Sequence, residues 1–240
     1  MHSAPDPIDI ILRAPGRNAM STALMTDLRA QLRAAAGRPV LLTGGDGAFC
    51  AGLNLKEVAS LDVDGMRRFL ELLEATVEDL FCYPGPLVVA VNGHAIAGGC
   101  VLTLCGDHRV MHDDPASRIG LNEVALGLEF PPKLFGAVRR RIAPRSLERV
   151  LLEAGLYDAA TALGFGIIDE IAADPVAAGR AQLARLAQHP VETFRETKRV
   201  LRGATLPVTA ERLRWFHDEL VPKWCAPEVK ARIRARLEKR

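Results

Sequence analysis

Short apolar runs alternate with amphipathic segments along the first two thirds of the chain, and this alternation constrains the fold most strongly. Residues 8–12, 40–43 and 87–91 are largely apolar, have the length of a strand and end at turn residues, which predicts β-strands. Residues 21–37 and 66–80 lie between them and place apolar side chains at helical spacing. Because strands and helices alternate, we predict an α/β fold with substantial parallel pairing.

The pattern changes near residue 177, after which only helices are predicted. Apolar residues recur at helical spacing over residues 177–188, 191–202 and 209–220. No linker rich in Ser or Gly precedes them. We therefore predict a core domain over residues 1–176 and a helical region, used for oligomerisation, over residues 177–240.

Charge and cysteine content exclude several classes of protein. The 240 residues include 31 Lys and Arg and 29 Asp and Glu, so a net charge of +2 draws the protein neither to nucleic acid nor to a membrane surface. The five cysteines form no C-x-x-C pair, which disfavours disulfides and zinc and fits a reducing compartment. No secretory signal or membrane-spanning window is visible, so we expect a soluble, cytoplasmic protein.

Two glycine-bearing segments are candidates for binding a carbonyl oxygen. In residues 49–55, Gly52 lets a ligand approach the main chain and frees the following N–H to point outward. In residues 93–101, Gly98 and Gly99 begin an apolar helix, whose first N–H groups have no partner within the helix. Each segment alone is more often a packing or capping device. Neither has the glycine spacing of a nucleotide phosphate loop.

The order and spacing of these segments resemble the enoyl-CoA hydratase/isomerase family, also called the crotonase superfamily. The resemblance covers nearly the whole chain and is carried jointly by residues 13–19, 49–55, 91–100, 107–110, 119–123 and 159–169. It implies a crotonase-like spiral of β-β-α units, a C-terminal helical region used in contacts of a homotrimer or a dimer of trimers, and acyl-CoA substrates. Coenzyme A would enter as part of the substrate, with no separate cofactor.

The resemblance also implies which residues form the site. The main-chain N–H groups of Leu53 and Gly98 would form an oxyanion hole, in which the side chain of Leu53 has no chemical part. Donors fixed where negative charge develops stabilise an enolate more than the thioester from which it forms. The loops that hold coenzyme A would do so through Arg17, Ala19, Ala51, Gly52, Asn54, Leu55 and Gly99.

Glu123 is the predicted proton carrier. Relatives that hydrate a double bond resemble one another in having two glutamates, and the first of these positions is Val101 here, whose side chain cannot activate water. Glu123 occupies the second position, and one carboxylate is enough to take a proton from C2 and return it at C4. The resemblance is greatest to the Δ3,Δ2-enoyl-CoA isomerases, so we predict an isomerase that shifts a double bond from C3 to C2.

Local sequence alone does not mark Glu123 as a catalytic residue. Without the resemblance, it would be taken for a surface or helix-capping glutamate. Its apolar neighbours in sequence predict a raised pKa, as a base that acts near neutral pH requires; they are Ile119, Leu121, Val124 and Leu126.

Glu129 leaves alternatives open. It lies six residues after Glu123, on the loop that in the family borders the acyl pocket, where an apolar residue is expected. As a second proton carrier, or as a base for water, it would make the protein an enoyl-CoA hydratase or an acyl-CoA thioester hydrolase. It would otherwise face solvent or pair with a cation. Relatives that shift a conjugated diene have an aspartate where this chain has Pro131, which disfavours that reaction.

The remaining candidates are interpreted as structural. Cys100 has apolar neighbours, which would raise the pKa of its thiol and disfavour a nucleophile. His108 and His112 lack the further ligands of a metal centre, so we predict no metal. A non-catalytic protein that binds CoA or RNA is a further alternative, because one branch of the family binds RNA. Aromatic residues make up only 5% of the chain and offer few surfaces for base stacking, so we expect no nucleic-acid partner.

Overall fold

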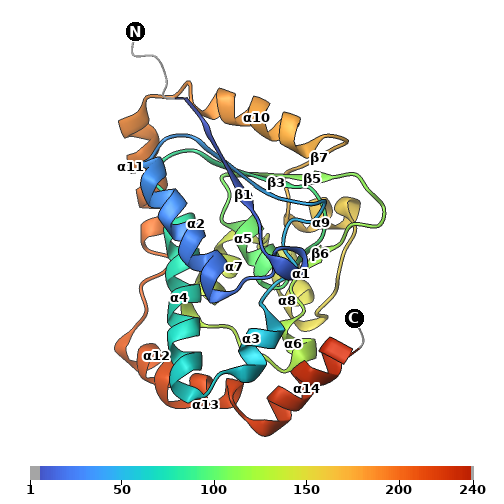
Figure 1. The fold of residues 1–240 in the computed structure, drawn as a ribbon. Helices are drawn as coiled ribbons and strands as arrows, with labels where there is room; N and C mark the ends of the chain where they lie inside the picture. The colour runs from blue at the N-terminus through green and yellow to red at the C-terminus, as the bar shows by residue number, and fades with distance from the viewer. Residues whose placement is uncertain (1–5, 239–240) are drawn as a thin grey trace.

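A five-stranded parallel sheet lies at the centre of the computed structural model, which describes residues 6–238 (Figure 1). Its strands are β1 (Ile8–Leu12), β2 (Val40–Gly44), β3 (Leu87–Val91), β5 (His108–His112) and β7 (Glu170–Ala172). They follow the order β1-β2-β3-β5-β7, and every neighbouring pair is parallel. The predicted α/β fold with parallel pairing is confirmed.

Helices cover both faces of this sheet. The first part of the chain forms α1 (Pro15–Asn18), α2 (Thr22–Ala35), α3 (Leu55–Ser60), α4 (Val63–Phe81), α5 (Gly98–Leu104) and α6 (Glu123–Leu126). The middle forms α7 (Pro132–Arg141), α8 (Pro144–Leu152), α9 (Ala159–Phe165) and α10 (Pro175–Leu186). The last part forms α11 (Val191–Gly203), α12 (Ala210–Trp215), a π-helical turn (Phe216–Leu220), α13 (Val221–Trp224) and α14 (Pro227–Glu238).

The two faces of the sheet enter different hydrophobic clusters, because successive side chains of a strand point to opposite faces. Leu41 and Val88, which are partners in register, pack with Leu183 of α10. Leu42 and Val89 belong to the larger cluster, which also takes in α2, α4 and α5. In Figure 1 α10 accordingly lies across the sheet from α2, α4 and α5. Although α10 belongs to the predicted helical region, it is part of the layered core.

Local capping explains where the predicted helices begin. The helix predicted from residue 66 begins at Val63, because the Asp62 carboxylate accepts a hydrogen bond from the Gly65 amide at 2.7 Å. The helix predicted over residues 177–188 spans Pro175–Leu186, with Asp174 as its cap. The segment 209–220 is helical as predicted, but α12 continues into the π-helical turn instead of one regular helix.

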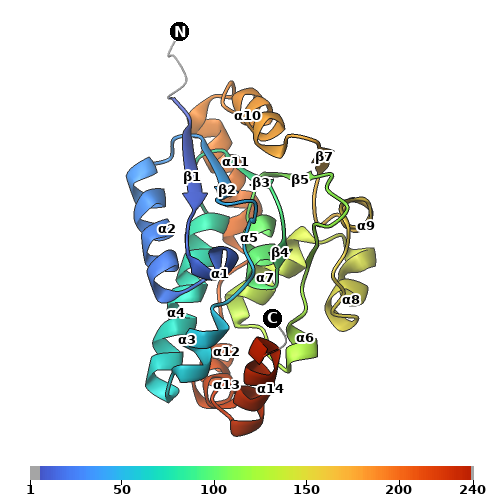
Figure 2. The ribbon, with the colours of Figure 1, turned by 45° about the vertical axis from the view of Figure 1, so that its right-hand side comes forward.

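The C-terminal helices α13 and α14 pack against α3, α4 and α6. Figure 2 shows α14 beside α3 and α6, and α13 packs on α4. The Lys230 ammonium of α14 donates to the Leu61 carbonyl at 2.6 Å. None of the helices within residues 6–238 is both long and apolar enough to cross a membrane.

Candidate active site

Parallel pairing brings the predicted site residues to one edge of the structure. Two short strands, β4 (Ala95–Ile96) and β6 (Ile119–Gly120), are parallel, and Cys50 forms a parallel bridge with Ala95. Leu53 follows Cys50, Gly98 follows β4 and Glu123 follows β6. Since parallel neighbours end at the same edge, the three residues that follow them converge there.

All three residues line one cleft. Its empty space is about 610 Å³ and is open to solvent. Apolar side chains dominate its walls, and the polar groups are few, as in most small-molecule sites. The walls are formed by residues 51–55, residues 96–98, the segment from Asn122 to Leu134, Leu73 of α4, Trp224 of α13 and Arg236 of α14.

The N–H groups of Leu53 and Gly98 are free to bind a ligand. Neither amide donates to any acceptor within residues 6–238. The loop around Leu53 is nevertheless held on both sides, because the Met20 amide donates to Gly52 at 2.8 Å and the Asn54 amide donates to Met20 at 2.9 Å. Gly98 is the first residue of α5, where the amide has no partner within the helix. Two fixed donors therefore face one cleft.

Glycines allow the two loops to touch. Gly52 has a φ of +87°, and a Cβ there would lie 2.8 Å from the Ile96 carbonyl oxygen. A Cβ on Gly99 would lie 2.2 Å from the Cys50 carbonyl oxygen. Side chains at these positions would force the loops apart, and with them the two donors.

Glu123 is a buried carboxylate with an unused oxygen. The residue is 8% exposed, and its Oε2 has no hydrogen-bond partner within the described residues. Burial raises the pKa of Glu123 to about 8, although its own backbone amide partly opposes the change. A carboxyl group with this pKa is suited to exchanging a proton near neutral pH.

The apolar surroundings of Glu123 come partly from its neighbours in sequence, of which Ile119 and Leu121 are buried, and partly from the tertiary structure. Val124, which suggested an apolar site, is 51% exposed. Leu128 and Leu134, which line the cleft with Glu123, are buried. The predicted direction of the pKa shift agrees with the structure, and burial is its cause.

Glu129 lines the same cleft and is paired with a cation. Its side chain is 46% exposed, and the Lys223 ammonium lies 3.2 Å from its Oε1. The Trp224 indole N–H donates to the Glu129 carbonyl at 3.2 Å. These two contacts tie the loop after α6 to α13, so Glu129 connects the cleft to the C-terminal helices.

The residues predicted to hold coenzyme A lie around the cleft in different ways. Ala51 and Leu55 line it directly. Arg17 is exposed, has a φ of +60° and accepts the Ala51 amide at its carbonyl at 3.0 Å. The remaining four are part of the loop structure. Ala19 and Gly52 are buried, and the Asn54 side chain caps α3 by accepting from the Glu57 amide. Gly99 lies against Cys50.

Asn18 was not predicted as a site residue, yet it organises the first loop. Its side-chain amide donates to the carbonyls of Gly45, Ala48 and Phe49 at 3.1, 2.8 and 3.2 Å, and its Oδ1 accepts from the Ala14 amide. Its φ of +58° is one that asparagine tolerates better than most residues. The signal available in the sequence was an Asn soon after Pro15-Gly16, a usual turn composition.

The other polar candidates have structural partners. Burial raises the pKa of the Cys100 thiol, which makes it a poor nucleophile. The His94 Nδ1 accepts from the Arg118 amide at 3.1 Å, and the His108 Nε2 lies 2.9 Å from Glu170. No group of three or more His, Cys, Asp or Glu within residues 6–238 is arranged to hold a metal ion.

Comparison with solved structures gives a close match over almost the whole chain. The crystal structure of the human mitochondrial Δ3,Δ2-enoyl-CoA isomerase superposes with a TM-score of 0.90 at 26% identity and covers 98% of this chain and 95% of that one. An enoyl-CoA hydratase from Bacillus halodurans superposes with a TM-score of 0.81 at 26% identity, with 96% of each chain covered. The crotonase fold predicted from sequence is confirmed.

Comparison of sequences finds relatives with two different activities in their names. The mouse mitochondrial enoyl-CoA delta isomerase 1 is 32% identical over 201 residues, which are 81% of this chain and 70% of the mouse protein. A probable enoyl-CoA hydratase of Mycobacterium tuberculosis is 30% identical over 196 residues, which are 80% of this chain and 75% of that protein. The model of the enoyl-CoA hydratase/isomerase family matches residues 8–239. The chain therefore belongs to the enoyl-CoA hydratase/isomerase family.

Proposed function

We propose that the protein is a Δ3,Δ2-enoyl-CoA isomerase. The thioester oxygen of a 3-enoyl-CoA accepts hydrogen bonds from the amides of Leu53 and Gly98. Glu123 removes a proton from C2, the negative charge spreads onto the thioester oxygen, and the protonated Glu123 returns the proton at C4. The double bond then lies between C2 and C3. No water and no further acid or base are consumed.

The buried, unpaired carboxylate of Glu123 is the observation that supports isomerisation most directly. Glu123 is buried, its Oε2 has no partner within residues 6–238, and it shares the cleft with the two free amides. Val101, which stands where hydratases have their other glutamate, is a buried apolar residue of α5. Addition of water needs a group that activates it, and Val101 cannot do this.

Glu129 supports a second candidate, an enoyl-CoA hydratase or a thioester hydrolase. It is the other carboxylate that lines the cleft, and one of the relatives is named as a probable hydratase. Against this stands the ion pair with Lys223, which occupies one oxygen of the Glu129 carboxylate. A non-catalytic role would require that no turnover of any acyl-CoA be found.

Three assays on one preparation distinguish these candidates. Conversion of a 3-enoyl-CoA to the conjugated 2-enoyl-CoA is followed by ultraviolet absorbance, loss of the conjugated band reports hydration, and a thiol reagent reports hydrolysis. We expect rapid isomerisation with little hydration or hydrolysis. Glu129→Gln should leave isomerisation within about threefold, since the pair it breaks is exposed. Dominant hydration that Glu129→Gln removes would instead favour the second candidate.

The assembly and location of the protein are separate proposals. We propose a homotrimer or a dimer of trimers, as the family resemblance implies, with residues 177–240 taking part in the contacts. Light scattering on the purified protein measures the mass and would contradict this proposal if it gave a monomer of 26.0 kDa. The cytoplasmic location stays a prediction, and the mouse relative named above is mitochondrial.

A further inference from the structure

A second cavity lies away from the cleft and is lined by an unusual number of cations. It is found between α7, α10 and α11, and its empty space is about 760 Å³. Arg140, Arg141, Lys198 and Arg202 line it, together with one carboxylate, Asp107. None of its lining residues lines the active-site cleft. We refer to it as the cationic cavity.

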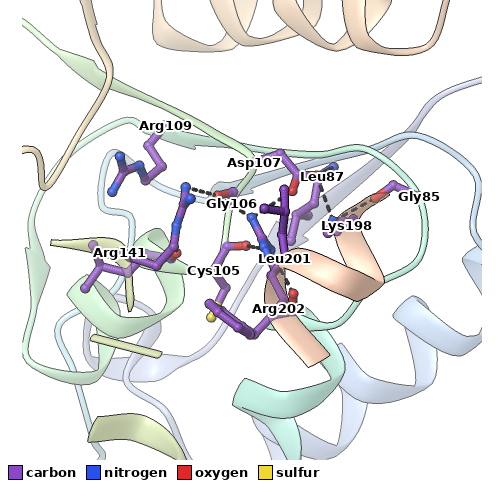
Figure 3. Close-up of polar contacts among 12 residues, drawn as sticks. Gly85, Leu87, Cys105, Gly106, Asp107, Arg109, Arg141, Lys198, Leu201 and Arg202 are labelled. Carbon is purple, nitrogen blue, oxygen red and sulfur yellow. Dashed lines mark hydrogen bonds and ion pairs between the residues drawn. The ribbon is translucent and has the colours of Figure 1, made fainter. Parts of the chain in front are cut away.

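The one carboxylate of the cationic cavity is already fully engaged. Asp107 accepts hydrogen bonds from the Lys198 ammonium at 2.7 Å and from the Leu87 amide at 2.8 Å, and it forms an ion pair with the Arg202 guanidinium at 2.8 Å (Figure 3). Lys198 also donates to the Gly85 carbonyl at 2.9 Å. Asp107 therefore has little capacity left to neutralise Arg140 and Arg141.

The two arginines of α7 that line the cavity, Arg140 and Arg141, have no carboxylate partner within residues 6–238. Arg141 donates through Nε to the Leu104 carbonyl at 3.0 Å and through Nη2 to the Gly106 carbonyl at 2.6 Å, and its Nη1 has no partner among the described residues. Arg140 makes one long contact, at 3.5 Å, with the Leu201 carbonyl. Both guanidinium groups retain donors for a ligand.

A charge count suggests what kind of ligand would fit. Four cations against one carboxylate leave three positive charges in excess. The cations bind carbonyls at the C-terminal ends of α4 and α5, and each helix end offsets about half a charge. About two positive charges remain uncompensated, which matches the charge of a phosphate group.

Burial, and to a smaller extent repulsion by neighbouring cations, disfavours the charged forms of Lys198 and Arg141. Burial lowers the pKa of Lys198 to about 8, although Asp107 opposes the change, and burial together with repulsion by Arg109 and Arg202 lowers the pKa of Arg141 to about 10. A bound anion would relieve both effects, and arginine forks are well matched to phosphate oxygens.

We infer that the cationic cavity is a binding site for a phosphate group, separate from the acyl-CoA cleft. The group would sit between the free donors of Arg140 and Arg141 and the Lys198 ammonium. Apolar side chains of Leu186, Phe194 and Leu201 line the same cavity and could cover the organic part of a phosphate monoester. Free phosphate and a monoester share the chemistry that this site recognises. The inference does not depend on which reaction the cleft catalyses.

The chain offers a matched pair of variants for the test. Arg140 and Arg139 are adjacent, exposed residues of α7, but only Arg140 lines the cavity. Arg140→Gln and Arg139→Gln remove the same charge. Isothermal titration with inorganic phosphate, at constant ionic strength set with chloride, measures the dissociation constant of each. AMP and adenosine, titrated in parallel, report whether an organic part adds affinity to the phosphate.

We expect saturable binding of phosphate to the wild type. Arg140→Gln should weaken this binding about threefold. Arg139→Gln should weaken it less than about twofold, because the charge that Arg139 carries is exposed and screened and lies outside the cavity. Arg141→Gln should weaken binding about tenfold or more, since it removes a charge-assisted bond. Tighter binding of AMP than of phosphate would identify a monoester as the ligand, and equal binding would identify the free ion. Adenosine should not bind.

Two results would overturn the inference, and neither requires Arg141→Gln to fold. Equal weakening by Arg139→Gln and Arg140→Gln would mean that phosphate responds only to net charge. The same titration in the presence of saturating CoA should still show phosphate binding. If CoA abolishes it while Arg140→Gln does not affect it, the phosphate binds where the CoA phosphates bind and the cavity is not the site.

Discussion

Glu123 and Asp107 are two carboxylates removed from water in the same domain, and their surroundings differ completely. Glu123 lies in the cleft with an oxygen that has no hydrogen-bond partner among the described residues, whereas Asp107 accepts two hydrogen bonds and pairs with two cations. They are associated with opposite ends of α5, which begins at Gly98 in the cleft and ends at carbonyls bound by Arg141 and Arg202.

The difference shows which part of the molecule is built for stability and which for chemistry. Leaving a buried polar atom without a partner costs about 1–3 kcal/mol, so such an atom persists only where something else requires it. In the cleft, the requirement that we propose is a substrate whose proton Glu123 must reach. Around Asp107, every oxygen is used to join the ends of α4 and α5 to α11.

The largest expected effect tests the cleft. Glu123→Gln keeps the shape of the side chain but removes the base, so isomerase kcat should fall by about 10²–10⁴-fold. Binding of CoA, measured by calorimetry, should stay within about a factor of two, because the variant changes none of the residues predicted to hold CoA. Isomerisation at the wild-type rate in this variant would contradict the assignment of Glu123.

The second prediction tests the other carboxylate. Asp107→Asn leaves Lys198 and Arg202 buried without a counter-charge and should lower the free energy of unfolding by about 3–5 kcal/mol, as measured by urea denaturation. Asp46→Asn is the control, because its side chain is 89% exposed and its contact with Arg13 is long. A loss no larger than that of the control would mean that the two carboxylates do not differ as described.

The third prediction separates the main-chain donors from side chains. Gly98→Pro deletes one oxyanion donor and should lower kcat by about 10²–10³-fold. Gly98→Ala adds a Cβ that would lie 2.8 Å from the Met20 sulfur but keeps the N–H, and so controls for crowding. Leu53→Ala should have almost no effect on kcat, because only the amide of Leu53 is used. A larger loss from Leu53→Ala than from Gly98→Pro would reject the proposed hole.

The fourth prediction follows from the pKa of Glu123, which burial raises from 4.5 to about 8. The base must be ionised, so kcat/KM should fall about tenfold for each pH unit below 8. In the unfolded chain Glu123 loses its proton near pH 4.5, so between 4.5 and 8 the folded state holds more protons. The contribution of Glu123 to the free energy of unfolding should therefore decrease as the pH rises from 4.5 to 8, and Glu123→Gln should abolish this decrease. If the difference in unfolding free energy between the wild type and Glu123→Gln did not change with pH, the raised pKa would be contradicted.

The smallest expected effect concerns the buried end of the cleft. Trp224 is 3% exposed and lines the cleft, whereas Trp215, the other tryptophan, does not. Trp224→Leu should increase kcat/KM for long relative to short acyl chains by about tenfold, in line with the energy of a few methylene contacts. Trp215→Leu should not change this ratio. Equal changes at every chain length in both variants would indicate a general loss of stability instead.

Regular elements of the core were predictable because their signals are local. The strands at residues 8–12 and 87–91 have the predicted bounds, since each is a run of strand-forming residues between turns. Glu123 could be chosen only through the family resemblance, because its own neighbourhood is that of an ordinary surface glutamate. Val124, which seemed to mark an apolar site, is exposed.

The partners that complete the cleft could not be predicted, because they lie far away in the chain. Glu129 meets Lys223 and Trp224, more than ninety residues later. Asn18 holds carbonyls almost thirty residues away, and nothing periodic marks such contacts.

The sequence by itself determined the strand and helix order, the parallel pairing that this order requires, and the glycines that allow two loops to approach. Only the tertiary structure decided that Glu123 is buried without a partner, that α13 and α14 help to form the cleft, and that four cations gather around one aspartate. The physical reason is range: turns, caps and periodicity act within a few residues, whereas burial and charge compensation depend on every element that packs nearby.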